Sequence, residues 1–357
     1  MVVAMTEAAG PGIDPQDRYS RQMLYERIGL EGQRRLGASR VVLVGCGALG
    51  SMIADTLVRA GVGHLRICDR DFVELDNLQR QVLFDEDDVR ANLPKAEAAR
   101  RKLRRINSQV SLEVVVSDVN HTNVERHVEG ADLLLDGTDN FETRYLINDL
   151  AVRDSIPWVY GAVIGATGLC LPIVPGETPC LRCVFESPPP PEMTPTCDTV
   201  GVLAPAVSVV AALECIEGMK VLTGRLEEVN RGLVSIDLWT GRWVRVNVGG
   251  AADATDCPCC RQRRFEYLDG SGASTTTHLC GRNAVQVNRA GGPAVDLAAI
   301  AARLKRVCSA PVTFNRFLLR AYVEDCELTL FGDGRAIIKG TDDADRARVL
   351  YSKYVGV

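Results

Sequence analysis

Short apolar strands alternate with helical segments between residues 40 and 161, and this alternation constrains the fold of the chain most strongly. Because strands that alternate with helices form βαβ units, we expect a mostly parallel sheet with helices on both faces. Gly61 follows the first helix and should end it. The expected strands cover 40–44, 64–68, 112–116, 131–136 and 158–161, and the expected helices cover 51–59, 96–106 and 145–152. The sequence therefore predicts an α/β, doubly wound fold.

The length of the chain and a change of rhythm after residue 161 predict a second, smaller unit. The 357 residues suggest two domains. We expect a disordered tail over 1–16, a nucleotide-binding domain over 17–268, a linker over 269–277 and a small α+β domain over 278–357. The role of the small domain stays open between partner docking and a stabilising appendage.

Several elements outside the alternating region can also be placed. Short helices are expected over 17–36, a long buried helix over 203–222, and a hairpin with a Thr-Gly turn from Ile236 onward. In the small domain, Asp296 is expected to be the N-cap of a helix whose apolar residues share one face. Strands should flank the turn at 331–335, and a final helix should cover 344–354.

Composition excludes several classes of protein. The net charge is −5, with 41 basic and 46 acidic residues, which argues against a nucleic-acid-binding surface. No apolar run reaches the roughly 18–20 residues of a membrane span, and the first residues lack the pattern of a secretory signal. The thirteen cysteines are therefore expected to be thiols or metal ligands in a reducing cytoplasm.

A glycine-rich loop joins the first strand to the first helix. Gly45, Gly47 and Gly50 form a G-x-G-x-x-G pattern, which lets the backbone approach a phosphate at a helix N-terminus. Asp69 ends the next strand and could bind ribose hydroxyls. This pattern predicts a Rossmann-like nucleotide site. It leaves open whether the ligand is a mononucleotide or the dinucleotide of an NAD-dependent oxidoreductase.

Polar residues beyond the second strand favour a triphosphate over a dinucleotide. Arg80 can make bidentate phosphate contacts, and Asn77 and Gln81 supply further donors. Lys95 is a second cation, and Asp139 is a hard oxygen ligand suited to Mg²⁺. All five should lie at the edge of the sheet where parallel strands end.

The spacing of four cysteines predicts a metal site. Cys180, Cys183, Cys257 and Cys260 form two C-x₂-C pairs, and two such pairs close a tetrahedral zinc site with no open position. We therefore expect this zinc to be structural. Cys259 would be a spare thiol.

The segments RYSRQ, VGCGALGS, DRDFVELDNLQRQ, NLPKAEAA and LDGTDN, together with the cysteine pairs, resemble the E1-like adenylyltransferases of the ThiF/MoeB/HesA type. The resemblance extends over about 17–261. It implies that Asp69 binds the adenosine ribose of ATP and that Asp139 organises Mg²⁺. It also implies phosphate contacts from Asn77, Arg80, Gln81 and Lys95. By the same resemblance, Arg21 would reach the ATP of the neighbouring subunit in a homodimer.

The resemblance also implies a substrate. In that family, the C-terminal carboxylate of a ubiquitin-like sulfur carrier ending in Gly-Gly attacks the α-phosphorus of ATP, and pyrophosphate leaves. Such a reaction serves molybdopterin, thiamine or related sulfur-transfer biosynthesis, with a sulfurtransferase or cysteine desulfurase as a further partner. Arg80, Lys95 and Asp139 would be the catalytic residues of this step. Cys197 could then take the activated carrier as a thioester or acyl disulfide, although some members act by adenylation alone.

Alternatives to a carrier-protein adenylyltransferase remain at this stage. A relative acting on a peptide or tRNA is the runner-up. An NAD-dependent oxidoreductase would leave Arg80, Gln81 and Lys95 without a task. A non-catalytic docking scaffold would not need Lys95 and Asp139.

Overall fold

The computed structural model describes residues 15–188, 197–251, 256–271, 277–279, 283–287, 295–308 and 310–355. The chain divides into two compact units. The first consists of Met1–Pro189 and Val202–Ala273, and the second consists of Pro190–Gly201 and Ser274–Val357. Most of the expected tail and part of the expected linker lie outside the described residues.

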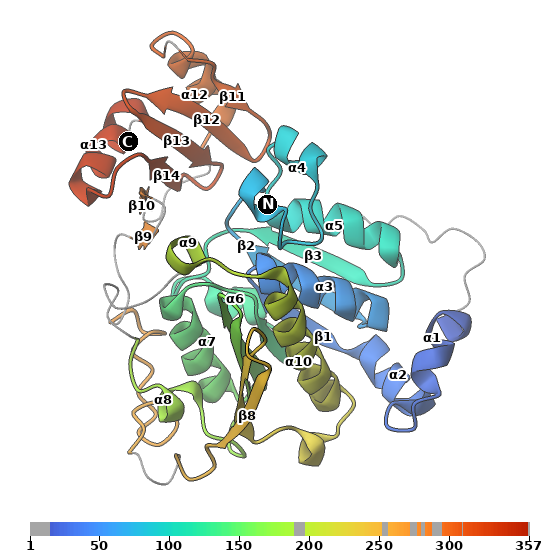
Figure 1. The fold of residues 1–357 in the computed structure, drawn as a ribbon. Coiled ribbons are helices and arrows are strands. Elements are labelled where there is room, and N and C mark those ends of the chain that lie inside the picture. The colour runs from blue at the N-terminus through green and yellow to red at the C-terminus, as the bar shows by residue number, and fades with distance from the viewer. Residues whose placement is uncertain are drawn as a thin grey trace. The chain divides into compact units, whose positions relative to one another are not determined.

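The first unit is built on an eight-stranded sheet with the strand order β3-β2-β1-β4-β5-β6-β7-β8. The strands β1, β2, β3 and β8 of this sheet are labelled in Figure 1. The strands β3, β2, β1, β4 and β5 pair in parallel, and the pairs from β5 to β8 are antiparallel. The prediction of a mostly parallel α/β sheet is therefore confirmed. The strands are β1 (Arg40–Val44), β2 (His64–Asp69), β3 (Ser111–Val116), β4 (Leu133–Asp136), β5 (Trp158–Ile164), β6 (Thr167–Ile173), β7 (Gly232–Asp237) and β8 (Arg242–Asn247).

Helices cover both faces of this sheet. The helix α3 (Ala48–Ala60) packs between α5 (Lys95–Ile106) and α10 (Ala204–Leu222) on one face. The helix α7 (Phe141–Asp154) contributes to the apolar core on the other face. The expected long helix is present as α10, and Gly61 ends α3 in the left-handed conformation with φ 84°. Shorter helices are α1 (Pro15–Met23), α2 (Gly29–Ala38), η1 (Leu75–Asn77), α4 (Glu86–Arg90), α6 (Val124–Val128), α8 (Leu181–Val184) and η3 (Leu226–Glu228).

The apolar sequence of the central strands explains their position. In β1, every residue from Val41 to Val44 is buried, as expected for a parallel strand with helices on both faces. The strand β4 is likewise buried along its whole length. These strands place their carboxyl ends, and the loops that follow, at one edge of the sheet.

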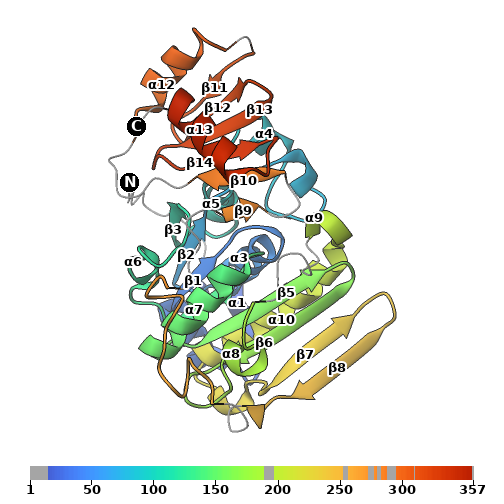
Figure 2. The same cartoon turned by 90° about the vertical axis from the view of Figure 1, so that its left-hand side faces the viewer.

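The antiparallel part of the sheet is larger than the sequence predicts. β5 continues to Ile164, and β6 follows after a turn in which Gly165 has φ 56°. Gly168 lies inside β6. Only glycine fits at this position, because a Cβ atom there would overlap a methyl group of Val210 on α10. The hairpin of β7 and β8 is present, as expected, and lies at the end of the sheet (Figure 2).

The second unit contains a six-stranded antiparallel sheet with the order β11-β12-β13-β14-β10-β9. Asp296 caps α12 by accepting hydrogen bonds from the backbone N–H groups of Ala298 and Ala299, as predicted. Strands flank the turn at 331–335, and the final helix is present. The elements are α9 (Cys197–Val200), β9 (Thr277–Leu279), β10 (Ala284–Val287), α12 (Leu297–Leu304), β11 (Thr313–Phe314), β12 (Leu318–Val323), β13 (Cys326–Phe331), β14 (Ala336–Lys339) and α13 (Ala344–Tyr354).

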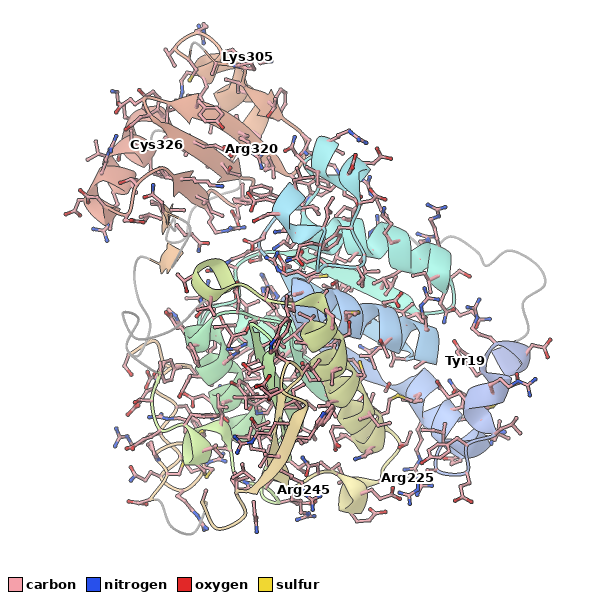
Figure 3. The ribbon with its side chains drawn as sticks, viewed as in Figure 1. Tyr19, Arg225, Arg245, Lys305, Arg320 and Cys326 are labelled. Carbon is pink, nitrogen blue, oxygen red and sulfur yellow. The ribbon has the colours of Figure 1, made fainter. Side chains whose placement is uncertain are left out.

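The second unit has its own apolar core. The core combines residues of β10, β12, β13 and β14 with one face each of α12 and α13. Cys326, labelled in Figure 3, is part of it, and burial raises the pKa of its thiol. That environment suits an inert core residue rather than a reactive cysteine. In the described part of the chain, no helix is long and apolar enough to cross a membrane.

Candidate active site

The loops that follow β1 and β4 meet where the order of the strands in the sheet reverses. The chain leaves β1 toward β2 and β3 on one side, and β4 and β5 lie on the other side. The loop after β1 contains Gly45, and the loop after β4 contains Gly137. A Cβ atom on Gly137 would overlap the carbonyl oxygen of Gly45, and so would one on Gly50. The two loops are therefore in backbone contact at the point where doubly wound sheets bind their ligands.

The glycine loop leads directly into α3. Gly47 is the N-cap residue of this helix, and no side chain caps its first N–H groups. Gly45 has φ 89°, which favours glycine. An uncapped N-terminus of a long helix is suited to a phosphate group, because the N–H groups and the helix dipole both favour negative charge.

Asp69 connects the end of β2 to the glycine loop. Its Oδ2 accepts a hydrogen bond of 2.6 Å from the backbone N–H of Cys46, and its Oδ1 accepts one of 2.6 Å from that of Asp71. Burial raises the pKa of the Asp69 carboxyl, and the nearby cation Lys95 acts in the opposite direction. Asp69 thus fixes the loop, and its contact with a ribose stays a prediction.

The segment after β2 carries the three polar residues that the sequence singled out. Asn77 is buried in η1, where its Oδ1 accepts from the backbone N–H of Glu74. Arg80 is partly exposed and donates a 2.7 Å hydrogen bond to the carbonyl of Asp76. Asn77 therefore stabilises the turn from which the next residues project.

Of the three residues, Gln81 gives the strongest evidence for a ligand site. It is 3% exposed, and its Oε1 has no hydrogen-bond partner among the described residues. Its Nε2 would lie 3.8 Å from a Cβ atom placed on Gly47. A buried amide with an unsatisfied oxygen beside the glycine loop is consistent with a polar ligand at this place.

Lys95 begins α5 at the same edge of the sheet. Its side chain is 5% exposed, and its Nζ lies 3.2 Å from Oδ2 of Asp71. The backbone N–H of Lys95 also donates to the carbonyl of Asp71, which fixes the start of the helix. The structure therefore brings Lys95 and Asp69 together through the segment 69–71.

Asp139 lies in the loop after β4, and a buried ion pair holds this loop. Arg144 on α7 donates from Nε to Oδ2 of Asp136 at 2.9 Å and from Nη2 to the carbonyl of Thr138 at 2.7 Å. Asp136 is fully buried, whereas Asp139 is exposed and available to a cation. Sequence reasoning missed Gly137, Asp136 and Arg144. The first aspartate of DGTDN is Asp136, and a charged residue at the end of an otherwise apolar strand could have indicated this role.

Arg21 is not brought to this edge of the same chain, and the structure does not test the position predicted for Cys197. Arg21 lies on α1. The next residue, Gln22, donates a 2.9 Å hydrogen bond to the carbonyl of Ala60, which is the last residue of α3. The 13 residues of α3 span about 20 Å, so Arg21 lies at the opposite edge of the sheet from Gly47. Cys197 begins α9 in the second unit, and its side chain is outside the described residues.

The four predicted metal ligands form a cluster in the first unit. The sulfur atoms of Cys180, Cys183, Cys257 and Cys260 lie within 4.8 Å of one another. The Cys180–Cys183, Cys180–Cys257 and Cys183–Cys260 sulfur distances are 3.8, 3.6 and 3.3 Å. Zinc–sulfur bonds of about 2.3 Å in a tetrahedron require sulfur distances of about 3.8 Å, so the cluster fits a zinc ion.

Helix α7 positions this cluster. Asn148 accepts a 2.8 Å hydrogen bond from the backbone N–H of Leu181, between the first two cysteines, and donates one of 3.3 Å to the sulfur of Cys259. Cys259 is buried but is not a member of the four-cysteine group. The cluster therefore joins the 180–183 and 257–260 segments to the same helix that holds the Asp139 loop.

Comparisons with known proteins agree with this geometry. The ThiF family model matches residues 19–259. The sulfur carrier protein ThiS adenylyltransferase of Bacillus subtilis is 44% identical over 95% of this chain and 99% of its own length. The SAMP-activating enzyme E1 of Haloferax volcanii is 41% identical over 71% of this chain and 92% of its own.

A solved structure is also similar. The crystal structure of E. coli MccB with ATP has a TM-score of 0.60 and 25% identity, and the match covers 69% of this chain and 75% of that one. Since the family model spans about two thirds of the chain and the Bacillus subtilis relative aligns over nearly all of it, this chain belongs to the ThiF family.

Proposed function

We propose that this chain uses ATP to adenylate the C-terminal carboxylate of a ubiquitin-like sulfur carrier protein, in thiamine, molybdopterin or a related sulfur-transfer biosynthesis. The observation that carries the proposal is the set of polar side chains, Gln81 and Lys95 foremost, around the uncapped N-terminus of α3. The chain is an adenylyltransferase, as relatives at 41–44% identity indicate. Those relatives act on sulfur carrier proteins by name, which supports the same substrate class here.

The proposed roles follow from position. The N-terminus of α3, Lys95 and Arg80 bind the phosphates of ATP, and Gln81 and Asn77 add hydrogen-bond donors. Asp69 binds the ribose, while it also holds the glycine loop through Cys46. Asp139, exposed in the loop held by Arg144, is the Mg²⁺ ligand, and the ion would neutralise charge on the phosphates.

The reaction needs positioning rather than acid–base chemistry. The carrier carboxylate attacks the α-phosphorus, the bond to the β-phosphate oxygen breaks, and pyrophosphate carries away the electron pair. Fixed cations and backbone N–H groups stabilise the charge that moves onto the leaving group. We propose that the carrier ends in Gly-Gly, because a tail without side chains suits an approach over closely packed backbone at Gly45, Gly50 and Gly137.

Further parts of the proposal concern metals and partners. Zinc held by Cys180, Cys183, Cys257 and Cys260 is structural, since four thiolates leave no position for substrate. We propose a homodimer in which Arg21 serves the ATP of the neighbouring subunit, and a cytoplasmic enzyme that keeps its thiols reduced. After adenylation, Cys197 accepts the activated carrier, and a sulfurtransferase or cysteine desulfurase supplies sulfur.

Replacement of Lys95 tests the phosphate site. Lys95→Ala should lower carrier-dependent ATP–pyrophosphate exchange by about 10²–10³-fold, because a charged contact to the phosphates is lost in the transition state. Lys102→Ala is the matched control: Lys102 lies on the same helix and pairs with Asp85 and Asp88 away from the glycine loop. Exchange at the wild-type rate in Lys95→Ala, with unchanged thermal stability, would remove Lys95 from the site.

A further inference from the structure

Lys95 occupies a position that the energetics of its helix do not favour. It is the first residue of α5, and a cation in the first turn of a helix is opposed by the helix dipole. Its side chain is 5% exposed, so its ammonium group has also lost most of its contact with water. Neither feature stabilises α5, which indicates that the position of this charge serves the neighbouring site.

A carboxylate that the backbone fixes offsets both costs. Oδ2 of Asp71 lies 3.2 Å from Nζ of Lys95. The backbone N–H of Asp71 donates a 2.6 Å hydrogen bond to Oδ1 of Asp69, and the carbonyl of Asp71 accepts one of 2.9 Å from the backbone N–H of Lys95. The next residue, Phe72, forms a β-bridge with Pro94. Asp71 therefore holds Lys95 through its backbone and through its side chain.

A second cation faces the other oxygen of this carboxylate. Nε of Arg70 lies 3.8 Å from Oδ1 of Asp71. The same guanidinium donates from Nη1 to Oδ1 of Asp118 at 2.9 Å, and Asp118 follows β3. One side of the Asp71 carboxylate thus faces a cation that is anchored to the end of β3, and the other side faces the start of α5. These two cations fix the orientation of the carboxylate.

The titratable groups that face the Lys95 ammonium come from three segments. Asp69 ends β2, Asp71 follows it, and Cys46 belongs to the glycine loop. Burial raises the pKa of the Asp69 carboxyl; Lys95 opposes this shift, and Asp71 adds to it. Burial also raises the pKa of the Cys46 thiol; Asp69 adds to this shift, and Lys95 opposes it. The charge of Lys95 therefore acts on the end of β2 and on the glycine loop.

An ammonium fixed in this way is in place before ATP arrives. A lysine side chain is flexible, and a lysine without such a contact would lose conformational entropy on binding a phosphate. A charge that is held beforehand needs no rearrangement when negative charge develops on the leaving pyrophosphate. The contacts of Asp71 therefore supply the preorganisation that phosphate chemistry requires of Lys95.

We propose that Asp71 is a positioning residue for adenylation, which holds the Lys95 ammonium at the phosphate-binding edge of the sheet and acts on the reaction only through Lys95. The proposal rests on the phosphate contact of Lys95 in the proposed function and identifies the residue that sets where this charge lies. Asp71 itself touches no substrate. Removing its charge should therefore impair catalysis without removing any ligand of ATP.

Asp71→Asn removes the charge and keeps the size of the side chain. In carrier-dependent ATP–pyrophosphate exchange, its kcat should fall by about 10–100-fold while its KM for ATP changes by less than about threefold, because a misplaced charge matters most in the transition state. Asp88→Asn is the matched control: Asp88 is also buried and also lies 3.2 Å from a lysine ammonium of α5, that of Lys102. It should exchange like wild type. A wild-type kcat in Asp71→Asn would overturn the proposal.

The pH profile separates positioning from a structural defect. In Asp71→Asn the buried ammonium loses a neighbouring negative charge, and burial then favours the neutral amine, which cannot stabilise a phosphate. The loss of exchange relative to wild type should therefore grow as the pH rises from 6 to 9. Asp71→Glu restores the charge and should remove this pH dependence. A loss in Asp71→Asn that is equal at every pH would overturn the proposal, since a structural defect acts in that way.

A double variant tests whether Asp71 acts through Lys95. In the Lys95→Ala background, the further change Asp71→Asn should lower exchange by less than about twofold, because effects that pass through one group do not add. A further loss as large as that of Asp71→Asn alone would show that Asp71 acts independently, and would overturn the proposal.

A readout without ATP or carrier separates this proposal from the proposed function. Acetylation of Lys95 by acetic anhydride, followed by peptide mass spectrometry between pH 7 and 10, reports the deprotonation of its amine. In Asp71→Asn the midpoint should move to lower pH by about one unit or more relative to wild type. An unchanged midpoint would overturn the proposal whatever the activity. Lack of exchange in wild type would contradict the proposed function alone, since acetylation is independent of it.

Discussion

One buried carboxyl group beside the central sheet is not among the proposed ligands of ATP. Glu214 on α10 is fully buried, and neither of its side-chain oxygens has a hydrogen-bond partner among the described residues. It lies directly against Gly161 of β5, where any Cβ atom would overlap the carboxyl. Burial raises the pKa of Glu214 well above its usual range; Asp136 adds to this shift, and Arg144 opposes it. Burial therefore favours the neutral form of the Glu214 carboxyl in the folded protein.

This environment predicts a pH dependence of stability. An acid whose pKa is higher in the folded state stabilises that state below its unfolded pKa of about 4.3 and loses the contribution as pH rises through the folded pKa. Glutamine does not titrate, so the Glu214→Gln variant lacks this loss of stability with rising pH. Above pH 5, the free energy of unfolding of the variant should therefore rise relative to that of wild type, by up to about 1.4 kcal/mol per pH unit. Urea unfolding from pH 5 to 8 measures this difference, with Glu227→Gln as the exposed control. Parallel curves for Glu214→Gln and wild type would show that the carboxyl is solvated or paired.

The proposed role of Cys197 makes a separate prediction. Every proposed ATP ligand lies on other segments, so Cys197→Ala should leave carrier adenylation and pyrophosphate release nearly unchanged. In wild type, attack of the Cys197 thiolate on the carrier adenylate would expel AMP and leave a thioester that hydroxylamine cleaves. Denaturing mass spectrometry with ATP, Mg²⁺ and carrier should show this adduct in wild type and not in the variant. An equal adduct on both proteins would assign the nucleophile to another cysteine.

Residues of the candidate site were predictable where a local pattern carries the chemistry. Gly45, Gly47 and Asp69 stand in a recognisable strand–loop–helix pattern, and the structure places them at one edge of the sheet. Gly137 could not be predicted in the same way, because its requirement comes from backbone contact with Gly45, which is 92 positions away in the chain. Arg144 was missed because its function is to hold a loop through Asp136.

The same distinction holds for the helices and strands. The parallel strands were predictable because each is a short, uniformly apolar run between helices. The strand β6 was not, because its glycine and proline suggest a break, whereas Gly168 makes room for Val210 of α10. In the second unit, the strands next to the turn at 331–335 were evident from the sequence. The pairing of β10 with β14 could not be predicted, because it depends on long-range contacts.

The zinc element can be tested by a pair of adjacent cysteines. Cys260→Ser should lose the zinc, about one ion per chain in wild type, and lower the melting temperature, because metal binding and folding are coupled in such sites. Cys259→Ser should retain the metal, since Cys259 lies outside the four-cysteine group. Metal analysis and thermal unfolding of the purified proteins measure both effects. Equal zinc loss in the two variants would place Cys259 among the ligands.

At the scale of the whole molecule, the two units have separate cores and separate sheets. The proposed ligands of ATP and zinc all lie in the first unit. The ThiF family match, over 19–259, ends before the first strand of the second unit's sheet. The Bacillus subtilis relative nevertheless aligns over 95% of the chain, so the second unit is shared with at least one adenylyltransferase. We therefore expect the residues that carry out adenylation to lie in the first unit, and the second unit to have a different role.

We therefore predict that a chain ending at Ala273 retains carrier-dependent ATP–pyrophosphate exchange. The cut falls at the end of the first unit and removes none of the proposed ligands of ATP or zinc, so the nucleotide site and the cysteine cluster should fold as before. Exchange rate, zinc content and melting temperature of the shortened chain would be measured beside those of the full chain. Retained zinc and cooperative unfolding show that the first unit has folded. A folded, zinc-bound chain without exchange would mean that the second unit supplies part of the active site, and the search for catalytic residues would then move to residues 274–357.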